Sequence, residues 1–364
     1  MELFIYDKDL ILKGIVDKIS SFIWTRRYWK AGDFKLLVPF TELNASLLQK
    51  DALLIKRGDD EAGQITYINI RKNVYGMEEI EVQGRFVTAW LDKRIVLTQI
   101  NANDNSQNLL NRVVTENITN PTNNKRKFPM FELETGQADV GSGLFNYTSE
   151  PFTSVLLAAE GLAMGAKIGF KVAADFRAAK YIFKVFKGRE LTVDQTDNPP
   201  CVFSQDFDNV YEQEYTNSTE HYKNTAYIGG EEREGIERVI VEIGDSAGLD
   251  RSEVFISASD IARISEADIT IPLATYRQML IDRGNTEIER FSETLNFSSK
   301  INSFSNLRYK VDYDIGDRVT CVNKSWGIKI TVRITEIMET FQRTRNDIFI
   351  TFGESLPTLF DKLN

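Results

Sequence analysis

The C-terminal segment Asp314–Gly353 constrains the fold most, because apolar and polar residues alternate along almost all of it. From Ile328 to Thr335 every second residue is aliphatic, which is the period of a strand with one buried face. The same alternation precedes it at Val319–Lys324 and returns at Ile348–Phe352. The segment therefore predicts three consecutive strands of an antiparallel sheet.

The composition indicates a folded protein of several domains. The chain has 364 residues, of which 42% are hydrophobic and 11% aromatic. Its net charge of -9 argues against a surface that grips nucleic-acid phosphates. No apolar run is long enough for a membrane span, and the N-terminus lacks the features of a secretory signal. Cys201 and Cys321 are expected to be two buried thiols rather than a disulfide.

Helical signals interrupt an otherwise strand-rich chain. Residues 1–97 are rich in strands, with one short helix at Thr41–Gln49 that Thr41 should cap. Apolar residues recur at helical spacing in Ser106–Ile118, in Ser154–Gly165 and in Asp268–Arg283, which continues towards Phe291. The pattern predicts β-rich parts with helical lobes between them.

Several ordered blocks resemble a known family. They are FIWTRRYWKAGDFKLLVP, LLIKRGDDEAGQITYINI and VQGRFVTAWLDKRIV near the start, PPCVFSQDFDNVYEQEYTNSTEHYKNTAYIGG after the middle, and GDRVTCVNKSWGIKITVRITEI near the end. These blocks resemble the siphophage and prophage tail-hub family, also called baseplate hub or tail-associated proteins. The family is in turn similar to the central hub protein of contractile-phage baseplates. The resemblance extends over roughly Leu10–Gly353.

The resemblance implies an α+β, mainly β fold: two tube-type antiparallel β-barrels with two inserted α/β lobes. The expected domains are a first barrel at 1–97, an α/β lobe at 98–198, a second barrel at 199–244 and 292–356, a small α/β lobe at 245–291, and a C-terminal tail at 357–364.

The resemblance also implies a function. The chain is expected to be a virion protein of the tail tip, made in the bacterial host cytoplasm, that forms a homotrimeric ring. A distal tail protein or the tail tube would lie above the ring, and a tip fibre or lysin below it. DNA would pass through without specific binding, and the chain would insert in no membrane. No catalytic residue, cofactor or metal is expected.

Two other functions stay open at this point. A tail-associated cell-wall hydrolase would need a catalytic site, but His221 is the only histidine. The sequence Gly244-Asp245-Ser246-Ala247-Gly248 matches a nucleophile elbow, yet a loop and strand are expected after it instead of a helix. A carbohydrate-binding adhesin would use exposed aromatic residues, and the only tryptophans are Trp24, Trp29, Trp90 and Trp326.

The candidate residues are therefore structural or interfacial. Arg26 and Arg27, with the aromatic residues beside them, fit a subunit contact better than a nucleic-acid stacking platform, given the acidic net charge. Gly327 is expected to adopt a backbone conformation that is costly for other residues. Strand faces that line the ring should carry more Asp, Glu, Ser, Thr and Asn than Lys or Arg, while Arg26, Arg27 and Arg333 point to subunit interfaces or lobes. The full set of candidates is Trp24, Arg26, Arg27, Trp29, Gly32, Trp326, Gly327 and Arg333.

One basic cluster has two interpretations. Lys125-Arg126-Lys127 lies in a polar stretch that is expected to be a solvated loop. The alternative is that it binds an anionic wall polymer.

Overall fold

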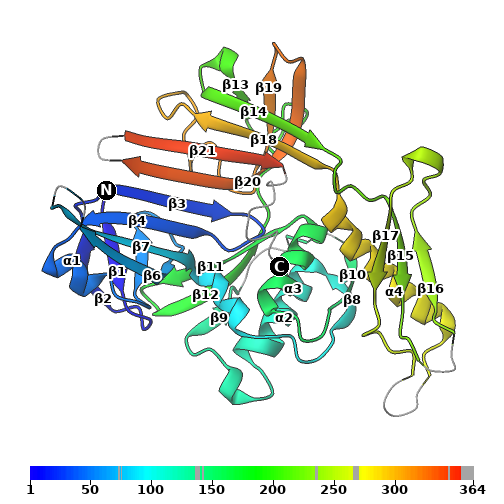
Figure 1. Cartoon of the computed structure of the whole chain (residues 1–364). Coiled ribbons are helices and arrows are strands. Elements are labelled where there is room, and N and C mark those ends of the chain that lie inside the picture. Colours follow the sequence, from blue (N-terminus) through cyan, green and yellow to red (C-terminus); the bar gives the residue numbers. More distant parts are fainter. Residues whose placement is uncertain are drawn as a thin grey trace.

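A computed structural model of the chain describes residues 1–353 except 73, 75, 136–139, 142, 234–236, 265–269 and 343–344. It shows a mainly β α+β fold, with one large, mostly antiparallel sheet, small mixed sheets and helices gathered in lobes (Figure 1). The expected tail at 357–364 and the expected helix start at Asp268 lie outside the described residues. Within the described part, no helix is both long and apolar enough to cross a bilayer.

The first half of the large sheet comes from the N-terminal strands. Phe22, Trp24, Phe34 and Leu36 alternate with polar residues along two of these strands and are buried on one face. Thr41 caps the short helix as expected, because its hydroxyl oxygen accepts a hydrogen bond from the Asn44 amide at 3.0 Å. The elements are β1 (Leu3–Tyr6), β2 (Leu12–Val16), β3 (Ser21–Arg27), β4 (Asp33–Pro39), α1 (Glu42–Leu47), β5 (Leu53–Lys56), β6 (Gly63–Lys72) and β7 (Glu78–Phe86).

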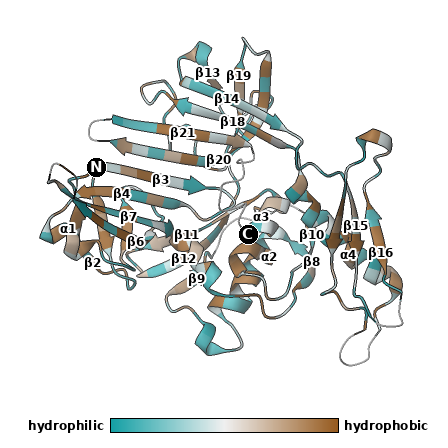
Figure 2. Cartoon of the chain, viewed as in Figure 1, coloured by the Kyte–Doolittle hydropathy of each residue, from teal (hydrophilic) through white to brown (hydrophobic). Residues whose placement is uncertain are grey.

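The second half comes from later parts of the chain. It contains the three closing strands in the predicted order, and each pairs antiparallel with the next. The elements are β13 (Val202–Ser204), β14 (Val210–Ser218), β18 (Thr294–Ile301), β19 (Arg318–Asn323), β20 (Ile328–Gln342) and β21 (Arg345–Gly353). Figure 2 shows hydrophobic and hydrophilic colours alternating along β20 and β21.

Strand β20 joins the two halves, which the sequence did not predict. It was expected to end at Thr335 but continues to Gln342. A β-bulge between Ile334 and Glu336 marks the change of partner: residues before it pair with β19, and Glu336–Gln342 pair with β3. The side-chain hydroxyl of Thr335 donates to the main-chain oxygen of Gly353 at this corner. The two halves are therefore parts of one sheet.

The two tube-type barrels that the family resemblance implies do not appear as closed barrels in this strand pairing. The strands run in the order β14-β18-β21-β20-β3-β4-β7-β6-β5-β1-β2, with β19 branching from β20 and β13 pairing with β19. Among the described residues, neither half closes on itself, because β2, β13 and β14 each have one strand partner only. Each half instead curls over its own buried core.

The α/β lobe follows the first half. Ser154 caps its longer helix, which continues one residue beyond the expected end at Gly165, because Lys167 supplies the left-handed C-cap with φ 55°. The elements are β8 (Asn101–Asn105), α2 (Ser106–Val114), β9 (Phe131–Leu133), β10 (Leu144–Thr148), α3 (Val155–Ala166), β11 (Gly169–Asp175) and β12 (Lys180–Phe186).

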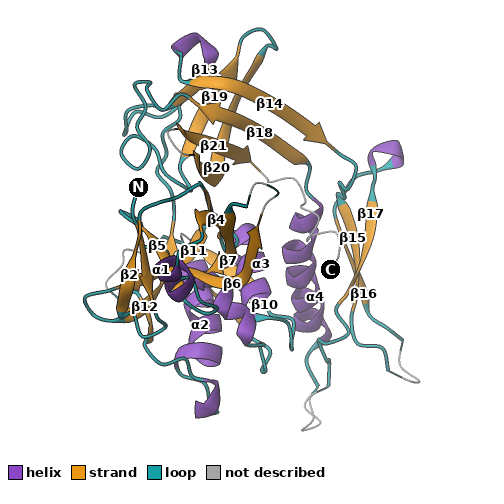
Figure 3. Ribbon diagram, turned by 60° about the vertical axis from the view of Figure 1, so that its left-hand side comes forward, coloured by secondary structure: helices purple, strands orange, loops and turns teal. Residues whose placement is uncertain are grey.

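The small lobe is larger than expected. Its sheet contains β15 (Thr225–Gly229), β16 (Ile240–Ile243) and β17 (Glu253–Ser257), and β15 pairs with both others. The helix α4 (Leu273–Ile288) covers one face of this sheet, with Tyr276 buried in the shared core (Figure 3). The lobe thus begins near Thr225 rather than at residue 245, because β15 and β16 pair within it and not with the second half.

Candidate assembly interface

One face of the large sheet is open across both halves. The register places the side chains of Ser21, Ile23, Thr25 and Arg27 in β3 on this face, and their cross-strand partners continue it from β14 to β6. We call this surface the open face. Its Asp, Glu, Ser, Thr and Asn side chains include Ser21, Thr25, Asp33, Asn69, Glu79, Glu81, Glu212, Glu214, Thr216, Ser218, Asn296, Ser298, Glu336, Thr340, Asp347 and Thr351.

Carboxylates on the open face neutralise most of its cations. The Arg27 guanidinium pairs with Glu336 at 2.6 Å and also with Asp33. Lys35 lies 2.9 Å from Glu81. The cations of this face are Arg27, Lys35, Arg71, Arg85, Lys300 and Arg345, and within the described residues all but Arg85 form an ion pair with a carboxylate of the same face. The open face therefore offers few free cations to an anionic ligand.

Two strand edges of the open face are unpaired within the described chain. β14 pairs only with β18, and beyond Gln64 β6 pairs only with β7. The outer part of β6 exposes Tyr67 and Ile70, with 47% and 55% of their surface accessible. Such edges present free N–H and C=O groups that can pair with another strand.

The opposite face carries a buried charged junction between the two halves. Arg26, which is 3% exposed, donates to Glu61 at 2.9 Å, to Asp314 at 2.7 Å and to the Tyr309 hydroxyl at 2.9 Å. These partners come from the loop after β5 and from the segment that precedes β19. We call this network the Arg26 junction. Arg26 was expected at a subunit interface or lobe, whereas its partners here lie in its own chain.

The junction is electrostatically compensated. Burial by itself would lower the pKa of Arg26, but the surrounding Tyr309 and carboxylates raise it well above its ordinary value. Burial would likewise raise the pKa of Asp59, yet Arg26, Lys56 and Lys310 hold it below the usual range. Both groups are therefore charged in the folded protein.

The acidic triplet Asp59–Glu61 beside the Arg26 junction could supply oxygen atoms to a metal ion, but cationic side chains already pair with its carboxylates. Oxygen atoms of Asp59, Asp60 and Glu61 lie within 4.8 Å of one another. Lys310 contacts Asp59, Lys171 contacts Asp60 and Arg26 contacts Glu61. Protein cations thus already satisfy these carboxylates.

Three N-terminal candidates, Trp24, Trp29 and Gly32, pack within the chain itself. Trp24 is fully buried, and its indole N–H donates to Asp59 at 3.1 Å. Trp29 is half-buried between the cores of the second half and the α/β lobe. A side chain at Gly32 would meet the Thr25 carbonyl oxygen at 2.3 Å, so only glycine fits there. Their part in an interface stays a prediction.

The C-terminal candidates cluster near the start and the bend of β20. Gly327 has φ 68°, which confirms the expected left-handed backbone. Trp326 beside it is 49% exposed and is available to a partner. The Arg333 guanidinium lies over the Tyr28 ring and donates to the Gly316 carbonyl at 2.5 Å. Burial lowers the pKa of Arg333, and Arg318 across the strand pair adds to this.

The described geometry brings together no catalytic group around the residues considered for hydrolysis. His221 is exposed. Ser246 lies in a loop, and the short turn Gly248–Asp250 and strand β17 follow it, so the strand–turn–helix of a nucleophile elbow is absent from this stretch. Cys201 and Cys321 are free and buried as predicted, and burial raises the pKa of Cys201 to about 12.

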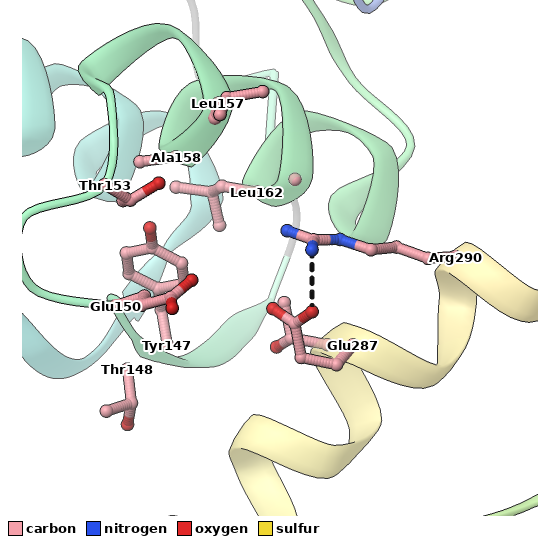
Figure 4. A pocket seen from close by; sticks show the side chains of 11 residues that line it. Tyr147, Thr148, Glu150, Thr153, Leu157, Ala158, Leu162, Glu287 and Arg290 are labelled. Carbon is pink, nitrogen blue, oxygen red and sulfur yellow. Dashed lines mark ion pairs between the residues drawn. The ribbon is translucent and has the colours of Figure 1, made fainter. Parts of the chain in front are cut away.

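A small crevice separates α3 from α4 (Figure 4). Glu287 and Arg290 form an ion pair at 2.9 Å on one side, and Tyr147 and Leu162 lie on the other. Its volume is about 30 Å³, which suits a water molecule rather than a substrate. The crevice is therefore a contact between the lobes and no ligand site.

Sequence reasoning missed the pairing of β20 with β3, although a local signal exists. Ile328, Val332 and Ile334 keep a strict alternation, but the next buried apolar residue is Ile337, three positions later. This slip of one residue is what a bulge produces.

Comparisons with known proteins agree with the fold. A family model described as Siphovirus ReqiPepy6 Gp37-like protein matches residues 2–354. The structure resembles a prophage MuSo2 43 kDa tail protein from Shewanella oneidensis, with 13% identity, TM-score 0.59 and coverage of 97% of this chain and 98% of that one.

Two other solved structures are similar. A tail protein from Neisseria meningitidis MC58 has 11% identity, TM-score 0.58 and coverage of 97% of this chain and 96% of that one. Prophage tail protein gp18 from Listeria monocytogenes EGD-e has 11% identity, TM-score 0.54 and coverage of 100% and 97%. At such identities the likeness shows a shared fold. A search of curated proteins finds no match.

Proposed function

The chain belongs to the Siphovirus ReqiPepy6 Gp37-like family, and from this we propose that it is a structural hub protein at the tip of a phage or prophage tail. The proteins of similar fold from Shewanella, Neisseria and Listeria are tail proteins, which supports the proposal. In this role the chain acts as a virion component without catalysis.

The observation that carries the proposal is the open face with its two free edges. Every neighbouring pair along β14-β18-β21-β20-β3-β4-β7-β6 is antiparallel, and the number of strands is even. β14 of one copy and β6 of the next therefore run antiparallel when copies join head to tail. Each half then acts as a tube-type barrel unit, and closing the ring removes both edges.

The division of the open face favours three copies. β14, β18, β21 and β20 come from the second half, and β3, β4, β7 and β6 come from the first. Three chains then present six similar units, which matches a sixfold tail tube above the ring. A distal tail protein or the tube is the proposed partner above, and a tip fibre or lysin the partner below.

The chemistry of the open face suits a channel for DNA. Acidic and neutral polar groups outnumber the cations, and most cations are held by carboxylates. A wall with few free cations releases few counterions from DNA, so the duplex does not stall. Arg27 was expected away from such a wall; it lies on the open face, where Glu336 and Asp33 neutralise it.

Mass measurement of the purified chain across concentration tests the ring, and we expect a homotrimer that does not retard duplex DNA. The exposed Glu212 and Glu214 of β14 would face the β6 edge, which carries Arg71 and Lys72. Glu212→Lys with Glu214→Lys should weaken trimerisation at least about tenfold, since like charges then meet. The control is Asp194→Lys with Asp197→Lys, which makes the same charge change at two exposed loop positions.

A wild-type chain that stays monomeric at high concentration, or forms only dimers, counts against the ring. If the trimer forms and the β14 variant trimerises normally, the ring stands but its edges are assigned incorrectly.

A further inference from the structure

A patch of cations lies on the α/β lobe of this otherwise acidic chain. Lys93 and Arg94 end the short helix Val87–Lys93, and Lys125, Arg126 and Lys127 belong to a loop beside it. We call these five residues the basic patch. The three lysines are exposed and both arginines are half-buried.

Hydrogen bonds fix the two arginines of the basic patch in place. Arg94 donates from Nε to the main-chain oxygen of Arg126 at 2.7 Å and from Nη1 to that of Lys93 at 2.8 Å. Arg126 donates to the main-chain oxygen of Ile95 and to the Asn117 side chain. Two guanidinium groups are thus held side by side by neutral acceptors.

Within the described part of the chain, none of the five cations of the basic patch forms a direct ion pair with a carboxylate. Burial lowers the pKa of Arg126, and the charge of Arg94 lowers it further. Burial also lowers the pKa of Lys93, and the like charges of Lys8 and Arg94 add to this while Asp51 opposes it. These cations repel one another, so binding of an external anion that neutralises them is favourable.

We propose that the basic patch binds the phosphodiester groups of a linear polyol-phosphate polymer, the kind of anionic chain found in cell walls. Arginine and lysine both suit phosphate, and contiguous cations suit a polymer with repeated phosphates. This inference stands apart from the ring, because it rests on residues outside the open face.

Two observations favour such a polymer over nucleic acid. The Trp90 ring is covered by Lys93 at 4.8 Å and the Phe128 ring by Arg94 at 4.4 Å, so neither offers a free platform for base stacking. The loop also lies at the end of the molecule away from β14, where the sequence colours of Figure 1 place it below α2. A ligand would therefore reach the basic patch from outside the proposed channel.

Binding of a synthetic poly(glycerol phosphate) oligomer to the full chain, measured by calorimetry at several salt concentrations, tests the proposal. We expect salt-dependent binding that Lys125→Glu with Lys127→Glu weakens at least about tenfold, with a flatter salt dependence. Both lysines are exposed, so the variant should keep its fold, which the thermal midpoint checks. The matched control is Lys18→Glu with Lys329→Glu at exposed positions elsewhere.

Three results overturn the proposal. The wild-type chain fails to bind the oligomer; the patch variant and the control variant bind it equally; or duplex DNA at the same phosphate concentration binds as tightly, which would make the patch a nucleic-acid site. A monomeric chain that still binds the polymer would remove the ring and leave this inference intact.

Discussion

Arg26 and Arg283 each hold two parts of the molecule together, and both are 3% exposed, yet they bind different groups. Arg26 joins the two halves of the sheet through carboxylates and a tyrosine hydroxyl. Arg283 of α4 joins the small lobe to the α/β lobe, where it donates to the main-chain oxygens of Thr148 and Ser149 and pairs with Asp260 at 2.8 Å.

The difference shows which contact is the firmer one. The Arg26 junction sets a buried cation against the buried Glu61 and the partly exposed Asp314, so removing Arg26 takes away the ion-pair partner of both carboxylates. The contact between the small lobe and the α/β lobe, which we call the lobe contact, depends largely on neutral hydrogen-bond acceptors of Arg283. If Arg283 is removed, Asp260 still accepts a hydrogen bond from Gln99. We therefore expect the sheet halves to stay together under conditions in which the small lobe opens.

The largest expected effect is that of Arg26→Leu. Removing the cation that pairs with the buried Glu61 and the partly exposed Asp314 should lower the free energy of unfolding by roughly 3–5 kcal/mol in chemical denaturation. Arg283→Leu is the matched control at equal burial, and its loss should be smaller, about 1–3 kcal/mol, because it mainly orphans carbonyl oxygens. A larger loss for Arg283→Leu would reverse the ranking of the two contacts.

The substitution Gly327→Val changes no charge and tests whether the Arg26 junction couples the two halves of the large sheet. Gly327→Val should cost roughly 1–3 kcal/mol through backbone strain, since φ is 68° and no atom lies within 4 Å of an added Cβ. Gly327→Asn is the control, because asparagine tolerates the left-handed region better. If the junction couples the halves, hydrogen exchange should speed up in β4 as well as in β20. Faster exchange in the second half alone would show that the halves open independently.

Features set by neighbouring residues could be predicted from the sequence. The Thr41 cap, the alternation of β19 and the turn at Gly327 depend on spacing within a few positions. The helices of the α/β lobe follow from apolar periodicity in the same way.

Features set by distant pairing could not be predicted. The partners of Arg26 lie 35, 283 and 288 residues away, and no local pattern marks which carboxylate it meets. The family resemblance suggested barrels, but only the register of β20 with β3 shows that the halves share one sheet. For the same reason the sequence could not assign Arg27 to the open face.

The smallest expected effect concerns pH at the lobe contact. Burial raises the pKa of Glu287, and Glu150 and Asp260 add to the shift, while Arg290 and Arg283 oppose it. A raised pKa in the folded state means that the protonated form is favoured there. The stabilising contribution is therefore full below the ordinary glutamate value and is lost as pH rises through the raised one.

Glu287→Gln should remove this dependence. Hydrogen exchange of α4 should become faster in the wild type as pH rises above the ordinary glutamate range, after correction for intrinsic exchange, and should stay flat in the variant. The difference should stay within about 1 kcal/mol, because Arg290 pairs with the charged form at 2.9 Å. Glu253→Gln, on exposed β17, is the control. Equal slopes in wild type and Glu287→Gln would show that the ionisation of Glu287 does not govern the opening of α4.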